Sequence, residues 1–275
     1  MTEPKMFLAA FILYILAAVL YLFFLFLKKE NAARNGYVLA AAGAVLHTLA
    51  LILRVFVIGH APFTNMYESL SFLAWASIAA YLVLERAFAI RKIGPFLLLL
   101  VIALMALASS PLMPKEAAPL VPALQSHWLW LHVSVTLIGE AFFAVGTLTS
   151  LLYLAAERRE RKGMARKGGH DEKDSAHYDT VSYRVIAIGF PLFTLGGLVF
   201  GMVWASKAWG SYWSWDPKEV WTLITWFIYG LYLHTRIVMG WKGRRSALIA
   251  VIAFLAALFT FFGVNYLLSG LHSYA

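Results

Sequence analysis

Long apolar stretches are the feature that most restricts what this chain can fold into. A helix that crosses a bilayer needs about 20 mostly apolar residues, and eight stretches approach that length: 6–27, 37–58, 69–90, 94–110, 128–154, 183–205, 217–239 and 246–268. Only 13% of the residues are charged, against about 25% in soluble domains. The sequence therefore predicts an all-α integral membrane protein, with about eight transmembrane helices in a single polytopic domain over residues 1–275.

Basic residues divide the connecting segments into two sets. Eighteen of the 23 Lys and Arg residues lie in segments 28–34, 86–92, 158–184 and 236–245. Because the cytoplasmic loops of membrane proteins are rich in Lys and Arg, we expect these four segments in the cytoplasm and both termini outside. The net charge of +9 thus indicates topology and not a nucleic-acid partner.

Two hydrophilic connectors and one glycine pair complete the organisation. The mixed-charge segment of about 157–182 predicts a mobile cytoplasmic loop, and the Pro-rich segment 109–126 predicts an extended outer connector. Gly197 and Gly201 form a GxxxG pair, which is typical of close helix packing. The chain contains no cysteine, which excludes a thiol nucleophile, an internal disulfide and Cys metal ligands.

Tryptophan is concentrated in one segment. Residues 204–226, WASKAWGSYWSWDPKEVWTLITW, hold six of the ten tryptophans. Membrane interfaces attract Trp and Tyr, so an interfacial belt is one interpretation of this segment. A flat apolar shelf for a large planar ligand, in an outer loop of about 206–217, is the other. Spacing leaves both open. The shelf residues would be Trp209, Tyr212, Trp213 and Trp215.

The shelf ends in a helix-start signal, Asp216-Pro217-Lys218-Glu219. Asp is a good N-cap, Pro suits the first helical position, and a Glu three residues after the cap closes a capping box. We therefore expect Asp216 and Glu219 to begin the seventh helix, in preference to acting as catalytic acids.

Histidines lie on both sides of this loop in the predicted topology. His132 begins the fifth span at its outer end, and His272 follows the eighth span, also outside. His234 comes 18 residues after Asp216 and should lie about 27 Å deeper. Imidazole is a ligand of haem iron, and two histidines over an aromatic platform suit haem. Spacing alone does not distinguish haem from another planar ligand or a metal.

Three further histidines receive no such role. His47 lies near the middle of the second span, where a buried packing residue and a functional site are equally compatible with the sequence. His60 and His127 fall in outer segments, and His127 precedes His132 by only five residues.

At this point the residues resemble a known family. The segment WGSYWSWDPKEVWTLITW is similar to the WWD signature of haem-handling proteins in cytochrome c maturation. GHAPFTNMYESLSFLAW (59–75), LQSHWLWLHVSVTLIGEAFF (124–143) and GVNYLLSGLHSYA (263–275) resemble the CcsA or ResC family of system II cytochrome c biogenesis proteins, named CcsB in many bacteria. The resemblance covers roughly residues 37–275.

The resemblance implies a function and a set of site residues. Such proteins work with a ResB-like membrane subunit as a cytochrome c synthase, carry haem b to the outer face and present it to the CxxCH motif of apocytochrome c. It implies that His132 and His272 are the external axial ligands, that His234 is the membrane-embedded ligand, and that the haem-contacting residues of the loop are Trp209, Trp213, Trp215 and Asp216. The implied location is the plasma membrane, or the thylakoid membrane in a plastid or cyanobacterium.

Mechanism and rivals follow from these residues. We expect catalysis by positioning, because holding reactants together lowers the barrier without a protein nucleophile. Whether this chain is itself an enzyme, as the haem-presenting subunit of a synthase, stays open. A haem exporter without synthase activity, a secondary transporter of another substrate and a structural scaffold for the partner are the alternatives.

Overall fold

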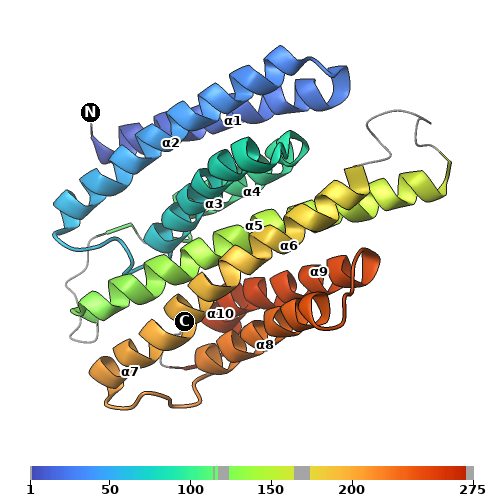
Figure 1. Cartoon of the computed structure of the whole chain (residues 1–275). Helices are drawn as coiled ribbons and strands as arrows, with labels where there is room; N and C mark the ends of the chain where they lie inside the picture. Colours follow the sequence, from blue (N-terminus) through green and yellow to red (C-terminus); the bar gives the residue numbers. More distant parts are fainter. Residues whose placement is uncertain (1, 114, 117–123, 164–173, 271–275) are drawn as a thin grey trace.

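The computed structural model describes residues 2–113, 115–116, 124–163 and 174–270 and consists of antiparallel helical hairpins (Figure 1). Its helices are α1 (Glu3–Leu27), α2 (Glu30–Ile58), α3 (Met66–Phe88), η1 (Arg91–Ile93), α4 (Gly94–Ser109), α5 (His127–Arg161), α6 (Asp174–Phe193), η4 (Thr194–Phe200), α7 (Gly201–Trp209), α8 (Pro217–Ile237), α9 (Arg244–Leu258), η5 (Phe259–Gly263) and α10 (Val264–Leu267). η4 and η5 are π-helical turns within longer helices.

Seven helical runs are long and apolar enough to cross a membrane. Two of them contain a π-turn: α6, η4 and α7 form one run, and α9, η5 and α10 form another. The eighth predicted span, α8, has 21 residues, but its Trp, Tyr and Thr residues make it less apolar than the others. The prediction of an all-α, multi-pass membrane protein is confirmed, and the described residues contain no strand.

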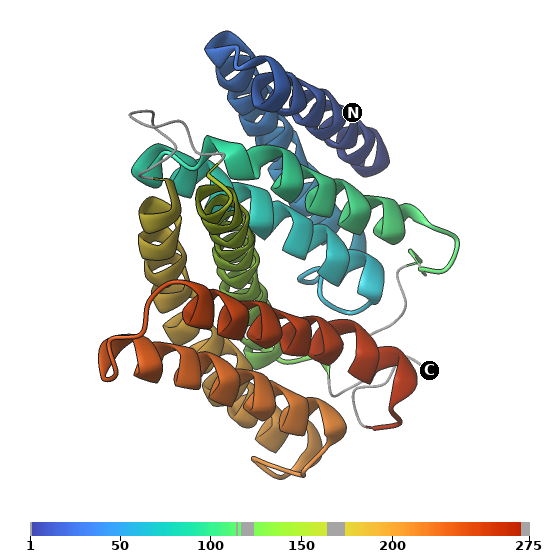
Figure 2. The same ribbon diagram turned by 90° about the vertical axis from the view of Figure 1, so that its right-hand side faces the viewer.

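The hairpins are stacked in layers, with α5 and α6 in the middle. Figures 1 and 2 show the α1–α2 and α3–α4 hairpins on one side of α5 and the α8–α9 hairpin on the other. Glycine allows close packing within the first hairpin, because a Cβ atom at Gly43 would lie 2.6 Å from the Tyr14 ring, and one at Gly36 would lie 2.9 Å from Tyr21. From its central position, α5 contacts helices from both halves of the bundle.

The two ends of the bundle differ in charge. The α1–α2, α3–α4 and α8–α9 connections lie at the same end as the neighbouring ends of α5 and α6 (Figure 1), and these are the four basic segments. The α2–α3 and α7–α8 connections and α10 lie at the opposite end. The alternation expected from the positions of Lys and Arg is therefore present in the fold.

The mobile loop predicted over about 157–182 is shorter than expected. α5 continues to Arg161 and α6 begins at Asp174, while residues 164–173 lie outside the described part of the chain. Ionic contacts stabilise these helix ends: Arg161 pairs with Glu157 at 2.9 Å, and Lys92 pairs with Asp174. Composition gives the number of charged residues but not their partners, so it could not predict these contacts.

His47 is a packing residue in this fold. Its side chain is fully buried, its Nε2 lies 3.0 Å from Ser71 Oγ, and its Nδ1 lies 3.4 Å from the Tyr14 hydroxyl. α1, α2 and α3 thus each supply one member of a hydrogen-bonded cluster. This arrangement provides hydrogen-bond partners for both nitrogens of a buried imidazole. It explains the presence of His47 without invoking a bound ligand.

Candidate ligand-binding site

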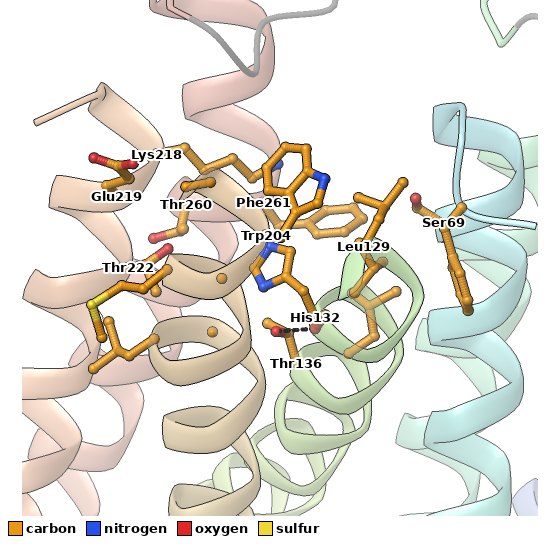
Figure 3. Close-up of a pocket in the computed structure, with 18 of the residues that line it drawn as sticks. Ser69, Leu129, His132, Thr136, Trp204, Lys218, Glu219, Thr222, Thr260 and Phe261 are labelled. Carbon is orange, nitrogen blue, oxygen red and sulfur yellow. Dashed lines mark hydrogen bonds between the residues drawn. The ribbon is translucent and has the colours of Figure 1, made fainter. Parts of the chain in front are cut away.

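A cavity of about 340 Å³ lies at the end of the bundle opposite the basic connections. α3, α5, η4, α7, α8, η5 and α10 all contribute to its wall, as does the loop between α7 and α8. Figure 3 shows side chains from these elements pointing toward one another around it. The aromatic residues of its lining are Phe63, Trp204, Trp209, Tyr212, Trp213 and Phe261. The volume is within the range of small-molecule sites, about 300–1,000 Å³.

His132 of α5 lies in the wall of this cavity with its ring orientation fixed on two sides. Its Nδ1 lies 2.8 Å from the Gly196 carbonyl oxygen, and its ring stacks on Trp204 with centroids 5.8 Å apart and planes at 5°. Since a carbonyl only accepts, Nδ1 must carry the proton, and Nε2 then carries the ring's lone pair. Metal-binding histidines are oriented by the same kind of contact to a backbone carbonyl.

The π-turn η4 brings this carbonyl to the imidazole. Gly196 accepts the hydrogen bond of Gly201 N–H, five residues later, and its oxygen also bonds His132. A Cβ atom at Gly196 would lie only 2.3 Å from the Thr136 backbone nitrogen, and one at Gly201 would lie 3.1 Å from the His132 ring. Glycine is therefore required where η4 crosses α5. π-turns within α-helices are frequent at functional sites, and η5 borders the same cavity through Thr260 and Phe261.

The tryptophan loop divides into residues that line the cavity and one that does not. Trp209, Tyr212 and Trp213 line it, whereas Trp215 is absent from the lining and is 71% exposed. Trp215 contacts Trp213 edge to face, with centroids 5.8 Å apart, and has a backbone φ of +61°. The predicted shelf is thus a wall of the cavity, which Trp204 extends inward by contacting Trp209 at 5.9 Å.

The helix-start signal at 216–219 forms the capping box that was expected. Lys218 N–H donates to Asp216 Oδ2 at 3.0 Å, and Asp216 N–H donates to Glu219 Oε2 at 3.2 Å. Glu219 also accepts from Ser214 N–H at 2.8 Å, so one carboxylate fastens the end of the tryptophan loop to α8. Asp216, which is 6% exposed, acts here on the backbone and does not line the cavity.

Two charged residues in the cavity wall were not singled out from the sequence. Glu140 of α5 is 6% exposed, and Lys218 of α8 donates from Nζ to Asn265 Oδ1 at 2.8 Å. Glu140 follows His132 by eight residues, so both lie on one helix face, about 12 Å apart along the axis. The available signal was an acidic residue in the middle of an apolar span, which is a functional-site hypothesis by default.

Of the other two predicted ligands, only His234 lies within the described residues. His234 is in the last turn of α8 with an exposed side chain, among the exposed apolar residues Phe227, Leu231 and Val238. Its imidazole has no hydrogen-bond partner among the described residues. His272 lies outside the described part of the chain.

The remaining outer histidines do not line the cavity. His60 contacts the Ala61 carbonyl with Nδ1 at 3.0 Å, and His127 lies at the exposed start of α5 against Trp130, with centroids 4.8 Å apart. Of the two neighbouring histidines in α5, it is therefore His132 that faces the cavity.

An aromatic cavity with an oriented histidine, enclosed by membrane-spanning helices, defines a ligand-handling integral membrane protein. Comparison with known sequences gives its family: the profile described as "Cytochrome C assembly protein" matches residues 63–272. The chain belongs to this cytochrome c assembly family and takes part in cytochrome c maturation.

Individual relatives agree with this assignment. The chain is 41% identical to the cytochrome c biogenesis protein CcsA of Synechococcus sp. (strain CC9605), over 97% of this chain and 94% of that protein. It is 44% identical to CcsA of Chlamydomonas reinhardtii, over 84% of this chain but only 65% of that longer protein. Among solved structures, a cytochrome c haem lyase, CcmF, has a similar fold, with a TM-score of 0.64 at 18% identity over 95% of this chain and 47% of CcmF.

Proposed function

We propose that this protein binds haem b in the cavity beside His132 and presents it to the CxxCH motif of apocytochrome c, as one subunit of a system II cytochrome c synthase. The observation that carries the proposal is the His132 imidazole, held by the Gly196 carbonyl and by Trp204 at the edge of an aromatic cavity. Membership of the cytochrome c assembly family makes haem the appropriate planar ligand.

The chain's own residues would act by orientation and enclosure. His132 would supply an axial nitrogen through Nε2, and His272 the second one. Trp204, Trp209 and Trp213 would cover the faces of the macrocycle, which favours a single pose. Haem supplies the vinyl groups that react with the substrate thiols, and a fixed pose brings these groups within reach of each other. This agrees with a chain that contains no cysteine.

A second haem position at His234 is part of the proposal. An imidazole on an exposed apolar helix face is costly in a bilayer and marks a functional site. Since His234 has no partner among the described residues, we propose that a ResB-like subunit covers this face of α8 and provides the opposite ligand. The cavity would then lie on the extracytoplasmic side, with His234 near the cytoplasmic side.

A visible spectrum of the purified protein, alone and with its ResB-like partner, tests the haem assignment. We expect a Soret band that is lost or altered in His132→Ala and in His272→Ala. His127→Ala is the matched control, because it removes a histidine only five residues from His132 on the exposed start of α5, and its spectrum should be unchanged. Absence of haem from every folded sample would contradict the proposal.

Covalent cytochrome c formation separates a synthase from an exporter. Cells that lack their own maturation system should accumulate haem-stained cytochrome c when this chain and its partner are expressed, and His132→Ala should abolish the stain. Imidazole added to the medium should restore part of it, since free imidazole can replace the missing ligand. Haem on the outer face without any covalent product would favour the exporter.

A further inference from the structure

Lys218 occupies an unusual place among the cations held within this bundle. Arg54 pairs with Glu68 at 2.8 Å, and Arg236 pairs with Asp179 at 2.7 Å. Lys218 also lies in the wall of the bundle, but within the described residues it forms no ion pair, and its Nζ bonds the neutral Asn265 amide at 2.8 Å. A partly exposed ammonium group in a cavity wall, without a direct carboxylate partner, marks a place for an anion.

The position of Lys218 in the cavity shows which part of a ligand it would meet. Figure 3 shows its side chain reaching from α8 toward Trp204 and the middle of the cavity. Asn265 is 1% exposed and is itself fixed, because its Nδ2 donates to the Phe261 carbonyl at 2.6 Å. The amide oxygen that orients Lys218 is therefore held rigidly, so the ammonium is positioned in advance of binding.

Glu140 limits how deep an anion can go. It lines the same cavity but lies beyond the 4.0 Å of an ion pair with Lys218, and it also borders a smaller apolar pocket between α3, α4, α5 and α9. Glu140 offers no positive charge to an anion that would enter further in. A ligand carboxylate would therefore stop at Lys218.

We propose that Lys218 and Asn265 form a carboxylate subsite that binds a haem propionate and fixes which edge of haem faces the start of α8. The inference rests on the proposed function and deepens it. In haem b the two propionates occupy one edge of the macrocycle, and the vinyl groups lie away from it. With a propionate on Lys218, the vinyl groups are turned away from the start of α8 and from α10, which leaves them free to meet the thiols of apocytochrome c.

The test compares metal-free protoporphyrin IX with its dimethyl ester, which has the same ring but no carboxylates. Both are titrated against the full-length protein in detergent, and binding is measured by quenching of tryptophan fluorescence, so that neither haem iron nor synthase activity is needed. A charge-assisted hydrogen bond predicts that the wild-type protein binds the diacid roughly 10-fold more tightly than the ester.

Substitutions assign this preference to one side chain. Lys218→Met should bind the two porphyrins equally and should retain the wild-type affinity for the ester, which also shows that its cavity is intact. Lys218→Arg should keep the preference. Lys207→Met is the matched control, since Lys207 is exposed at the end of α7 and does not line the cavity, and it should behave as wild type.

The possible results separate the two proposals. Equal affinity for both porphyrins in the wild-type protein, or a preference that survives in Lys218→Met, would overturn the carboxylate subsite and leave the haem site standing. Failure of the folded wild-type protein to bind either porphyrin would contradict the proposed function and the subsite together.

Discussion

Trp215 is a residue whose backbone and side chain both have unfavourable surroundings. Its φ of +61° is in the left-handed region, and its side chain is 71% exposed. A non-glycine residue in that region costs roughly 1–2 kcal/mol, and an exposed indole adds little packing in return. Backbone strain of this kind gathers at functional sites, which supports a role for Trp215 when a ligand or partner is present.

Trp215→Gly should separate stability from binding. Glycine adopts positive φ readily, so we expect the free energy of unfolding to stay level or rise by up to about 1 kcal/mol. Loss of the edge-to-face contact with Trp213 should weaken haem binding about 3- to 10-fold. Thermal unfolding and haem titration in detergent measure the two effects. Trp204→Gly provides the contrast. Because Trp204 is 4% exposed, this variant should lose both stability and haem affinity. Reduced stability with unchanged haem affinity in Trp215→Gly would refute this interpretation.

His47→Leu should have the opposite signature to a substitution at His132. It leaves the Ser71 and Tyr14 hydroxyls of the cluster without their imidazole partner, which costs about 1–3 kcal/mol for a buried polar group. The thermal midpoint should therefore fall while the visible spectrum of bound haem stays unchanged. A shifted Soret band in His47→Leu would show that His47 belongs to a haem site after all.

At the scale of the element, the two π-turns are what adapt ordinary transmembrane helices to the cavity. η4 brings the Gly196 carbonyl to His132, and η5 places Thr260 and Phe261 in the wall of the same cavity. The helices continue through both turns without unwinding, including at Pro191 inside α6. The described residues therefore lack the broken helices expected of the secondary-transporter alternative.

Gly196→Ala should damage the site through the backbone. The added methyl group would meet Thr136 N at 2.3 Å, so η4 must move away from α5 and the contact to His132 is lost. Contacts that orient metal-ligating residues are worth roughly 10- to 100-fold in affinity, and we expect a loss of haem affinity in that range. Gly230→Ala is the control, since Gly230 does not line the cavity and the nearest atom to its added methyl group is Phe190 Cζ at 3.7 Å. An equal loss in both variants would point to general destabilisation.

Much of the fold could be predicted from sequence, and less of the site. Helix lengths and the start of α8 follow from local rules, because hydropathy and the Asp216–Glu219 capping box act within a few residues. The sequence motif suggested His132 as a candidate ligand and predicted the aromatic wall, but Trp204 and Lys218 were interpreted only as parts of a belt and a cap. The roles of Trp204 and Lys218 depend on contacts with α5 and α10, and such contacts cannot be predicted from periodicity or composition. The π-turns leave no hydropathy signal at all.

At the scale of the whole molecule, charge and cavity occupy opposite ends. The basic connections lie together at one end of the stacked hairpins (Figure 1), and the residues that line the cavity lie toward the other. Loops rich in Lys and Arg remain cytoplasmic, so we expect the tryptophan loop to face the extracytoplasmic compartment.

The absence of cysteine allows a direct test of this orientation, because single cysteines can be added without a background. Tyr212→Cys in the tryptophan loop should react with a membrane-impermeant maleimide in intact cells. Lys242→Cys, which is exposed in the α8–α9 connection, should react only after the membrane is permeabilised. The reverse pattern would invert the topology and place the cavity on the cytoplasmic side.

The contact between His132 and Gly196 has a consequence for how the protein tolerates genetic change. The group that orients the imidazole is a main-chain oxygen, which every amino acid carries, so no substitution can delete it outright. The oxygen moves away from His132 only if the backbone of η4 changes its path, and glycine at position 196 is what allows the present path. This hydrogen bond to the proposed iron ligand is thus insensitive to most substitutions of the surrounding side chains, and it is vulnerable only at the few positions that form the π-turn.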